Sequence, residues 1–437
     1  MAKTNRKLGL YTSTSLVVGN MIGAGIFLMP ATLATYGTVG IAGWLCAATG
    51  AILLAKIFSN LSKIMPLANG GPYAYSREGL GNFAGFIVAW GYWISVWCTN
   101  AAIAVSLVSA LSTFFPVLAT SSIAAIGTGL SAIWLLTYIN TLGIITSGIV
   151  QLFTTILKII PLLAVGIAGI FFINTHHFPA FNTSNTSTFT ALTNTTALTF
   201  FAFLGMECAT IPAANVANPT VTIPKATMLG TLLTTFIYIL CSVVMMGIIP
   251  ADTLSHSVTP LADAAVIIYG PYAAYFVSAG AAIAAFGALN GWILIQGQVP
   301  AAIATDKLFP AIFKQQNKKG VPATGIIIGS ILVSVVMTMN YTKSLADQFK
   351  FLILLTTLTV LVPYLLSATA YVILELKQKK HPPAKTFKIM LHGLLAFTFS
   401  LWAVAGSGEE VVYWGFILLM AGIPFYAWII IQQNKKL

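Results

Sequence analysis

Two charged residues lie inside long apolar segments of this sequence, where charges are rare. Lys158 occurs in FTTILKIIPLLAVG, and Glu207 occurs in FFAFLGMECAT. A charged side chain within a membrane is costly unless it is paired or hydrated, and such residues commonly mark substrate, ion or proton pathways. Lys158 and Glu207 are therefore candidates for binding an ionic ligand or for carrying protons. The alternative is a buried Lys–Glu pair that only holds helices together.

Glycines interrupt the first apolar segment of the chain. Gly19, Gly23 and Gly25 stand in VVGNMIGAGIFLMP, which covers residues 17–30. Each glycine costs a helix about 1 kcal/mol relative to alanine, so the cluster favours a break in the helix. Gly205, just before Glu207, marks a second such point. Interrupted spans at matching positions of two halves are the best sequence indicator of a transporter's binding site.

A broken helix can supply the surface that binds a ligand. Its backbone polar groups are tolerated within a membrane only where they are buried in protein or line a cavity. The N-terminus of a half-helix also attracts an anion such as a carboxylate. Freed N–H groups at one end of a cavity and the Glu207 carboxylate at the other suit an amino acid with a cationic side chain. A simple kink, or close helix packing at small residues, is the alternative.

Aromatic and polar residues of other apolar segments could complete this site. Aromatic faces stack on a guanidinium or ammonium group for about 0.5–2 kcal/mol, and they can also close over a substrate as gates. The alternative for each aromatic residue is packing or anchoring at the membrane interface. The candidates are Tyr92, Trp93, Trp97, Asn100, Trp292, Thr356 and Tyr364.

The composition indicates which elements must position these residues. Of the 437 residues, 58% are hydrophobic and only 7% are charged, whereas about 25% of an average soluble domain is charged. The apolar runs reach the roughly 20 residues that cross a bilayer as a helix. The sequence therefore predicts an all-α polytopic protein in a lipid bilayer. About twelve spans are expected, near residues 10–34, 41–64, 82–113, 121–140, 143–172, 194–215, 226–249, 263–297, 323–340, 351–374, 387–406 and 411–432.

The distribution of charge predicts the orientation of these spans. The formal net charge is +12, but Lys and Arg fall mainly in alternate loops, which is typical of membrane topology rather than of nucleic-acid binding. Lys343 and Lys350 break this asymmetry, and residues 174–195 are expected to form an external loop. The positive-inside rule places both termini in the cytoplasm. The basic and then apolar N-terminus resembles a signal peptide, but we interpret it as an uncleaved first span.

Other functional classes fit the sequence less well. A channel would need a repeated filter or a ring of charges, and neither occurs. An enzyme would need a catalytic set, but no HExxH, GxSxG or nucleotide-binding loop is present. The four cysteines lie in apolar runs without CxxC spacing, which favours free thiols over a metal site. We therefore expect no enzymatic activity, no metal and no cofactor. The histidines are expected in loops or near span ends: His176, His177, His256, His381 and His392.

The chain resembles the amino acid–polyamine–organocation superfamily of transporters from about residue 8 to residue 432. The order and spacing of the matching strings are specific, although several strings are individually common. Among these proteins it is most similar to antiporters for basic amino acids and polyamines. The strings are GNMIGAGIFLMPA, GGPYAYSREGLG, YWISVWCTN, AFLGMECA, GIIPADTL, GWILIQGQ, DKLFPAIF, LVPYLL and WAVAGSGEE.

The resemblance implies a single transporter domain over 1–437 with a five-plus-five inverted repeat and alternating access. The repeats would cover about 8–172 and 190–374, followed by two further helices over about 386–432, with the first and sixth helices unwound at the midplane. It also implies a bacterial inner-membrane protein that binds a small amino acid or polyamine. A homodimer is compatible with the resemblance, although no sequence feature demands one.

The resemblance further implies roles for individual residues. The backbone around Ala24 and Gly25 would hold the substrate's carboxylate and α-amino group, and Phe201 and Trp292 would stack on its side chain. Tyr92, Glu207 and Tyr364 would form an inner gate, with Trp292 also a middle gate, and Tyr73 would respond to pH. The implied substrate-binding set is Ile22, Gly23, Ala24, Gly25, Ser95, Val96, Asn100, Ile103, Phe201, Leu204, Trp292 and Thr356.

Four departures from these antiporters bear on the substrate and the coupling. Ala24, Phe201 and Thr356 stand where the antiporters have serine, tryptophan and serine. Lys158 resembles instead the fifth-span lysine of proton-coupled and exchanger-type permeases, where it would replace a sodium ion at the broken first span. The leading prediction is antiport of a basic amino acid against its decarboxylation product or another amino acid. The alternative is proton-coupled uptake of neutral amino acids that uses Lys158, with Glu207 as a second candidate for coupling.

Overall fold

The computed structural model describes residues 7–23, 25–257, 259–339, 345–378 and 381–434, and within these ranges it is almost entirely helical. The single β-type contact in this part of the chain is an isolated bridge between Leu8 and Val216. The α-helices are α1 (Leu10–Met21), α2 (Gly25–Ala34), α3 (Val39–Ile64), α4 (Pro72–Leu80), α5 (Asn82–Ser112), α6 (Val117–Thr120), α7 (Ser122–Thr141), α8 (Ile144–Gly169), α9 (Thr188–Phe200), α10 (Pro219–Ile248), α11 (Ala251–Ser255), α12 (Pro260–Tyr269), α13 (Ala273–Thr305), α14 (Ala323–Met339), α15 (Leu345–Gln378), α16 (Pro383–Ala405), α17 (Glu409–Met420) and α18 (Gly422–Asn434). The 3₁₀ segments are η1 (Ile170–Phe172), η2 (Thr175–His177), η3 (Phe201–Phe203), η4 (Cys208–Thr210), η5 (Ala213–Asn215) and η6 (Ala311–Lys314).

Ten segments of the described chain are long and apolar enough to cross a membrane. The protein is therefore a multi-pass membrane protein, and the predicted all-α polytopic fold is confirmed. α1 and α2 together make one of these segments, as do α17 and α18. The predicted ninth span is the shorter apolar helix α14. The predicted sixth span is α9 followed by η3, η4 and η5, rather than one continuous helix.

Several predicted boundaries were wrong. α9 begins at Thr188, inside the segment assigned to an external loop, because the Ser187 hydroxyl caps it by accepting from the Thr190 N–H. The predicted span 263–297 is two helices, since the chain turns at Gly270, whose φ of +88° favours glycine. α13 then continues to Thr305. His392, expected near a span end, lies within α16 and contacts the Leu53 carbonyl at 3.0 Å.

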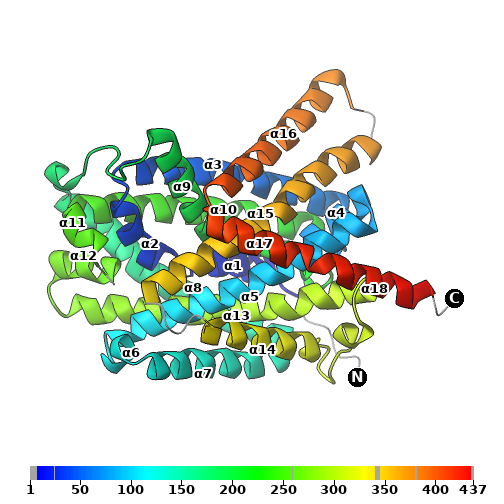
Figure 1. The fold of residues 1–437 in the computed structure, drawn as a ribbon, viewed down its shortest axis with the longest axis horizontal. Helices are drawn as coiled ribbons and strands as arrows, with labels where there is room; N and C mark the ends of the chain where they lie inside the picture. The colour runs from blue at the N-terminus through cyan, green and yellow to red at the C-terminus, as the bar shows by residue number, and fades with distance from the viewer. Residues whose placement is uncertain (1–6, 24, 258, 340–344, 379–380, 435–437) are drawn as a thin grey trace.

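The spans run side by side, so the molecule has two ends (Figure 1). α4 and the end of α18 lie at one end, and α11 and α12 lie at the other. We call the face at which α1 begins and α4 lies the N-terminal face, and the other the opposite face. The helix α4 was not predicted, and its first position is Pro72, which suits a helix start.

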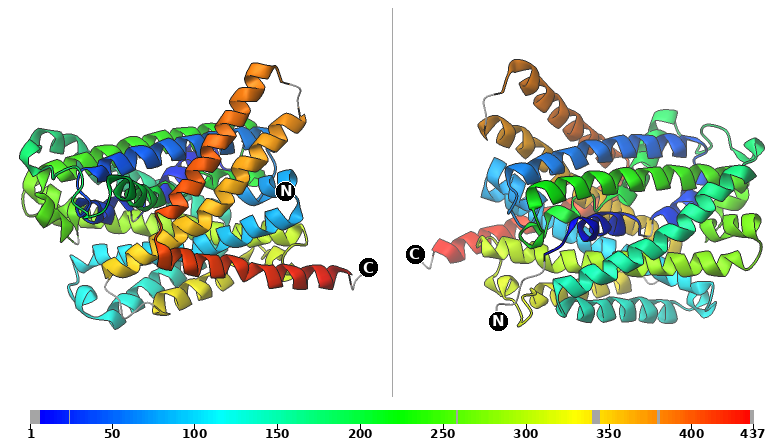
Figure 2. Two further views of the ribbon diagram at one scale, coloured as in Figure 1. Left: turned by 45° about the horizontal axis from the view of Figure 1, so that its top comes forward. Right: turned by 180° about the vertical axis from the view of Figure 1, so that it is seen from behind.

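The first span is enclosed by the rest of the bundle. In its most apolar stretch 88% of the residues are buried, whereas in that of α16 only 28% are buried. α8, α10 and α13 pack around α1, while α16 and α18 project from the bundle in both further views (Figure 2). An interior span with glycines can approach its neighbours closely. A Cβ on Gly19 would lie 1.9 Å from Nε2 of Gln151 on α8, so a larger residue there would require the Gln151 side chain to move.

Candidate functional site

The first span breaks where its glycines cluster. α1 ends at Met21, Ile22 has a non-helical ψ of 81°, and α2 begins at Gly25. This confirms the predicted break. Ala24, predicted to hold the substrate, lies outside the described residues, so its placement stays a prediction.

Side chains from three other helices hold the carbonyl groups at the end of α1. The last carbonyls of a helix have no partner within it and must find one elsewhere. The Lys158 ammonium donates to the Gly19 and Ile22 carbonyls at 2.6 and 2.5 Å. The Trp292 indole donates to the Asn20 carbonyl at 3.2 Å, and the Tyr238 hydroxyl lies 2.5 Å from the Met21 carbonyl.

The second break lies across from the first. After η3, Leu204 is extended with ψ 137°, and Gly205 adopts φ +105°. This φ favours glycine, and a Cβ there would also lie 2.9 Å from the Asn20 Cβ. The Asn20 amide donates to the Cys208 sulfur at 3.0 Å. Gly205 thus lets the two broken spans meet at Asn20.

Glu207 follows the second break and is fully buried. Its carboxylate accepts from the Tyr92 hydroxyl on α5 and, at 2.5 Å, from the Tyr364 hydroxyl on α15. The structure therefore brings together the three residues predicted as an inner gate. Lys158 and Glu207 do not form the ion pair considered as an alternative, because neither of the two ion pairs between described residues involves them.

A cavity of ≈ 10 Å³ lies between the two breaks. This is about the volume that one water molecule needs, so binding of an amino acid requires movement of the cavity's walls. Gly23, Ile103, Phe201, Leu204 and Trp292 were predicted and line the cavity. Sequence reasoning missed three lining residues, Asn20, Met21 and Thr99.

The other described residues of the predicted binding set do not line this cavity. Ile22, Gly25 and Val96 are buried, and the Ser95 hydroxyl donates to the Tyr92 carbonyl. The Asn100 amide donates to Oε1 of Gln296 at 2.9 Å. Oδ1 of Asn100 and Oγ1 of Thr356 are buried and make no hydrogen bond with any described residue.

Trp93 and Trp97 belong to the packed interior rather than to this cavity. Their rings meet edge to face with centroids 4.7 Å apart, and Trp93 also packs against Phe309. The alternative of a packing role is therefore the better interpretation for both residues.

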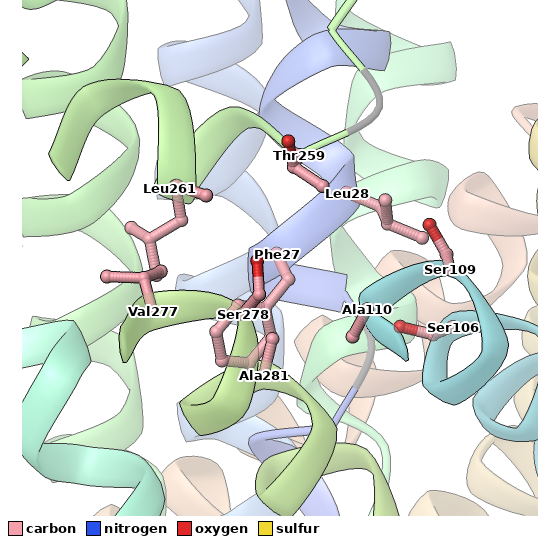
Figure 3. Close-up of a pocket in the computed structure, with 11 residues that line it drawn as sticks. Phe27, Leu28, Ser106, Ser109, Ala110, Thr259, Leu261, Val277, Ser278 and Ala281 are labelled. Atoms are coloured by element: carbon pink, nitrogen blue, oxygen red, sulfur yellow. The ribbon is translucent and has the colours of Figure 1, made fainter. Parts of the chain in front are cut away.

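A second cavity, of ≈ 20 Å³, is drawn with its lining residues in Figure 3. Leu261 of α12 lines it, so it lies toward the opposite face. Phe27 and Leu28 of α2 line it together with Ser106 and Ser109 of α5. Ile103 lines the first cavity and Ser106 lines the second, one helical turn further along α5. The two cavities therefore lie next to each other along α5.

Contacts at the N-terminal face join α4 to the end of α13. The Tyr73 hydroxyl donates to Asp306 at 2.8 Å, and the Arg77 guanidinium lies 2.8 Å from the same carboxylate. Burial is the largest cause that raises the pKa of Tyr73 above its ordinary value, and the neighbouring Asp306 raises it further. Nearby, Leu8 and Val216 pair the segments that flank the two broken spans.

Comparisons with known proteins agree with this architecture. A family model described as amino acid permease matches residues 8–431. The cadaverine/lysine antiporter of Escherichia coli strain K12 is 32% identical over 428 residues, which cover 97% of this chain and 95% of that protein. The arginine/agmatine antiporter of Chlamydia felis is 31% identical over 452 residues, which cover 100% of this chain and 91% of that protein. The arginine/agmatine antiporter of Chlamydia pneumoniae is 31% identical over 451 residues, which cover 99% of this chain and 91% of that protein. Two broken spans around a buried cavity, in a chain matched over nearly its whole length, identify this protein as a member of the amino acid permease family.

Proposed function

We propose that this protein is an antiporter that exchanges a basic amino acid for its decarboxylation product, a polyamine, or for another amino acid by alternating access. The observation that carries the proposal is the cavity between the two broken spans, with aromatic Phe201 and Trp292 in its wall. Relatives named as lysine/cadaverine and arginine/agmatine antiporters support a basic substrate. They do not favour the uptake of neutral amino acids.

The two ends of the substrate would meet different chemistry. Its carboxylate would bind the N–H groups at the start of α2, because the N-terminus of a half-helix attracts anions. Its cationic end would stack between Phe201 and Trp292. Oδ1 of Asn100 and Oγ1 of Thr356, which have no partner among the described residues, would accept hydrogen bonds from an ammonium or guanidinium group. An apolar side chain would leave these oxygens unpaired, which is costly in a buried site.

The contacts around the breaks would act as gates. Trp292 is bound to the Asn20 carbonyl, so its movement would open the cavity beside α1. Glu207 joins the second break to α5 and α15 through Tyr92 and Tyr364. Separation of this trio would open the cavity on one side of the membrane.

Lys158 would couple the state of the first break to protons. Its ammonium binds two freed carbonyls, and a neutral amine would hold them less strongly because charge-assisted hydrogen bonds are the stronger ones. Release of its proton would loosen the end of α1. We place the N-terminal face in the cytoplasm by the positive-inside rule, in a bacterial inner membrane. The inverted repeat over 8–172 and 190–374 and the homodimer stay predictions.

Exchange in proteoliposomes tests the proposal. Labelled lysine and labelled arginine are each offered to vesicles that are empty or preloaded with cadaverine, agmatine or leucine. We expect uptake into the vesicles loaded with cadaverine or agmatine and little uptake into empty vesicles. The combination of labelled amino acid and internal amine that gives the fastest uptake shows whether the substrates are lysine and cadaverine or arginine and agmatine. Equal uptake into empty and loaded vesicles would reject antiport.

A further inference from the structure

The buried face of α8 changes character at Lys158. Buried positions recur every three or four residues, which places them on one face of the helix. On the N-terminal side of Lys158 these positions hold Ser147, Gln151 and Thr155. On the other side they hold Leu162 and Val165. Polar and apolar halves therefore meet at the lysine.

The polar half of α8 extends to the N-terminal face. A Cβ on Gly148 would touch Thr12 and Leu8, at the start of α1. Further along, the Thr155 hydroxyl donates to the Ser15 carbonyl at 3.2 Å. Lys158 then reaches the break itself. The polar stripe thus follows α1 from the N-terminal face to the break.

Amide side chains from two other helices extend this stripe. The Ser147 hydroxyl donates to Oδ1 of Asn140 on α7 at 2.8 Å. Asn290 on α13 donates to the Ser147 carbonyl at 3.1 Å and lies 3.4 Å from Oε1 of Gln151. Gln151 in turn lies 3.4 Å from Oδ1 of Asn20. A hydrogen-bonded cluster therefore fills the space between α1, α7, α8 and α13.

The cluster also approaches the loop at the N-terminal face. Asn317, which is half-buried between η6 and α14, donates to the Thr141 carbonyl at 2.9 Å. Thr141 is the last residue of α7 and follows Asn140. The polar contacts can thus be followed from this loop to the first break.

The opposite half of α8 offers no comparable route. A Cβ on Gly166 would touch Leu240 and Cys241, and one on Gly169 would touch Val244. The Cys241 thiol donates weakly to the Leu162 carbonyl at 3.4 Å. Apolar packing closes this half of the helix.

We propose that the polar half of α8 lines the route by which Lys158 exchanges its proton with the solution at the N-terminal face. Packing alone does not require these residues, because buried amides and hydroxyls cost free energy unless each is hydrogen-bonded. When this interface opens, the same groups can hydrate. The Lys158 ammonium then passes its proton to water at that face and regains one from it. The inference rests on the proposed coupling role of Lys158.

The titratable groups around Lys158 do not offer it a carboxylate partner. From α10, Tyr238 contacts the Met21 carbonyl and Cys241 contacts α8. From α12, the Tyr269 hydroxyl donates to the Ala164 carbonyl. The Cys208 sulfur accepts from the Asn20 amide. The described residues around Lys158 thus provide no carboxylate to accept its proton, and water is the acceptor that remains.

Accessibility of introduced cysteines tests the route. Thr155→Cys lies on the polar half of α8, and Val165→Cys is its control because valine and threonine have the same shape. Lys318→Cys, on the exposed loop after η6, identifies the N-terminal face in the same membranes. A membrane-impermeant methanethiosulfonate is applied from each side, without substrate, and labelling above that of the parent chain is measured.

We expect Thr155→Cys to react from the side that labels Lys318→Cys, at least about tenfold faster than from the other side, since thiol reactivity requires access. Val165→Cys should stay at the parent level from both sides. Labelling of Thr155→Cys from the opposite face, or at the parent level from both faces, would overturn the proposal. This result does not depend on which substrate is exchanged, so it is separable from failure of the proposed antiport.

A functional test uses Gln151→Leu, which keeps the side-chain size and removes the amide. Exchange is measured while the pH on one side of the membrane is varied and the other is fixed. We expect an altered response to pH at the N-terminal face and an unaltered response at the opposite face, with substrate binding retained. An unchanged response at both faces would contradict the proposal. Thr234→Val, a buried hydroxyl on α10, is the control for loss of a buried polar group.

Discussion

The Lys158 ammonium lies 2.6 Å from the Gly19 carbonyl, across the end of the broken first span. It also binds the Ile22 carbonyl beyond the last turn of α1. One side chain of α8 therefore holds the end of α1 where the helix unwinds. Loss of this contact should change the transport cycle more than the stability of the bundle.

Lys158→Met should lower the exchange rate about tenfold or more. Each hydrogen bond to a charged group is worth about 1.5–3 kcal/mol, and about 1.4 kcal/mol corresponds to a tenfold change in rate. Exchange in proteoliposomes measures the effect, with Lys158→Arg as the variant that keeps the charge. The idea fails if Lys158→Met leaves both the rate and its pH dependence intact.

Glu207→Gln should slow exchange by roughly tenfold, because an amide has one acceptor oxygen for the two hydroxyls of Tyr92 and Tyr364. Tyr364→Phe removes only one of the hydrogen bonds and should have the smaller effect. Both variants are compared with the wild type in initial rates of exchange. A wild-type rate for Glu207→Gln would show that the buried carboxylate has no part in gating.

Phe201→Trp should increase the apparent affinity for a basic substrate several-fold. Tryptophan is the best aromatic partner of a cation, and such contacts are worth about 0.5–2 kcal/mol. Phe201→Leu, which keeps an apolar side chain without the ring, should reduce the affinity. Competition against labelled lysine measures both variants. If the two substitutions shift the affinity in the same direction, the ring does not stack on the cation.

A pH response at Tyr73 should act through its contact with Asp306 rather than through ionisation of the phenol. Burial and Asp306 raise the pKa of Tyr73, so the hydroxyl stays protonated between about pH 5 and 8. Stability linked to this proton is present below the ordinary tyrosine pKa of about 10 and is lost only as the pH rises above it. Tyr73→Phe and Asp306→Asn should therefore alter the pH profile of exchange in the same way. Opposite changes in the pH profile would show that Tyr73 and Asp306 do not act through a shared contact.

The broken spans were predictable because glycine is a local signal. Gly23, Gly25 and Gly205 disfavour a continuous helix whatever surrounds them, and both breaks occur where these residues stand. The charged residues were also predictable as buried, because a membrane span gives charges few other environments. The predicted grouping of Tyr92, Glu207 and Tyr364 came from a resemblance, and the structure does place them in contact.

The contacts that join the breaks to their neighbours were not predictable from the chain. Tyr238 occurs in an apolar segment and has the pattern of a packing residue, but its hydroxyl lies near the Met21 and Ala202 carbonyls of both breaks. Asn20 lies between Gly19 and Gly23. Its role is evident only from its contacts with Cys208 and Gln151 in the folded protein. Such roles depend on residues distant in sequence, so no local pattern carries them.

The most direct test of the account compares lysine with norleucine, which has the same chain length but lacks the terminal charge. Uptake of labelled lysine is measured in proteoliposomes that are empty or loaded with lysine, cadaverine or norleucine. The account predicts rapid uptake into vesicles loaded with lysine or cadaverine, and uptake close to the empty control with norleucine inside. Equal uptake with norleucine and with cadaverine inside would contradict a site that selects its substrates by their distal positive charge.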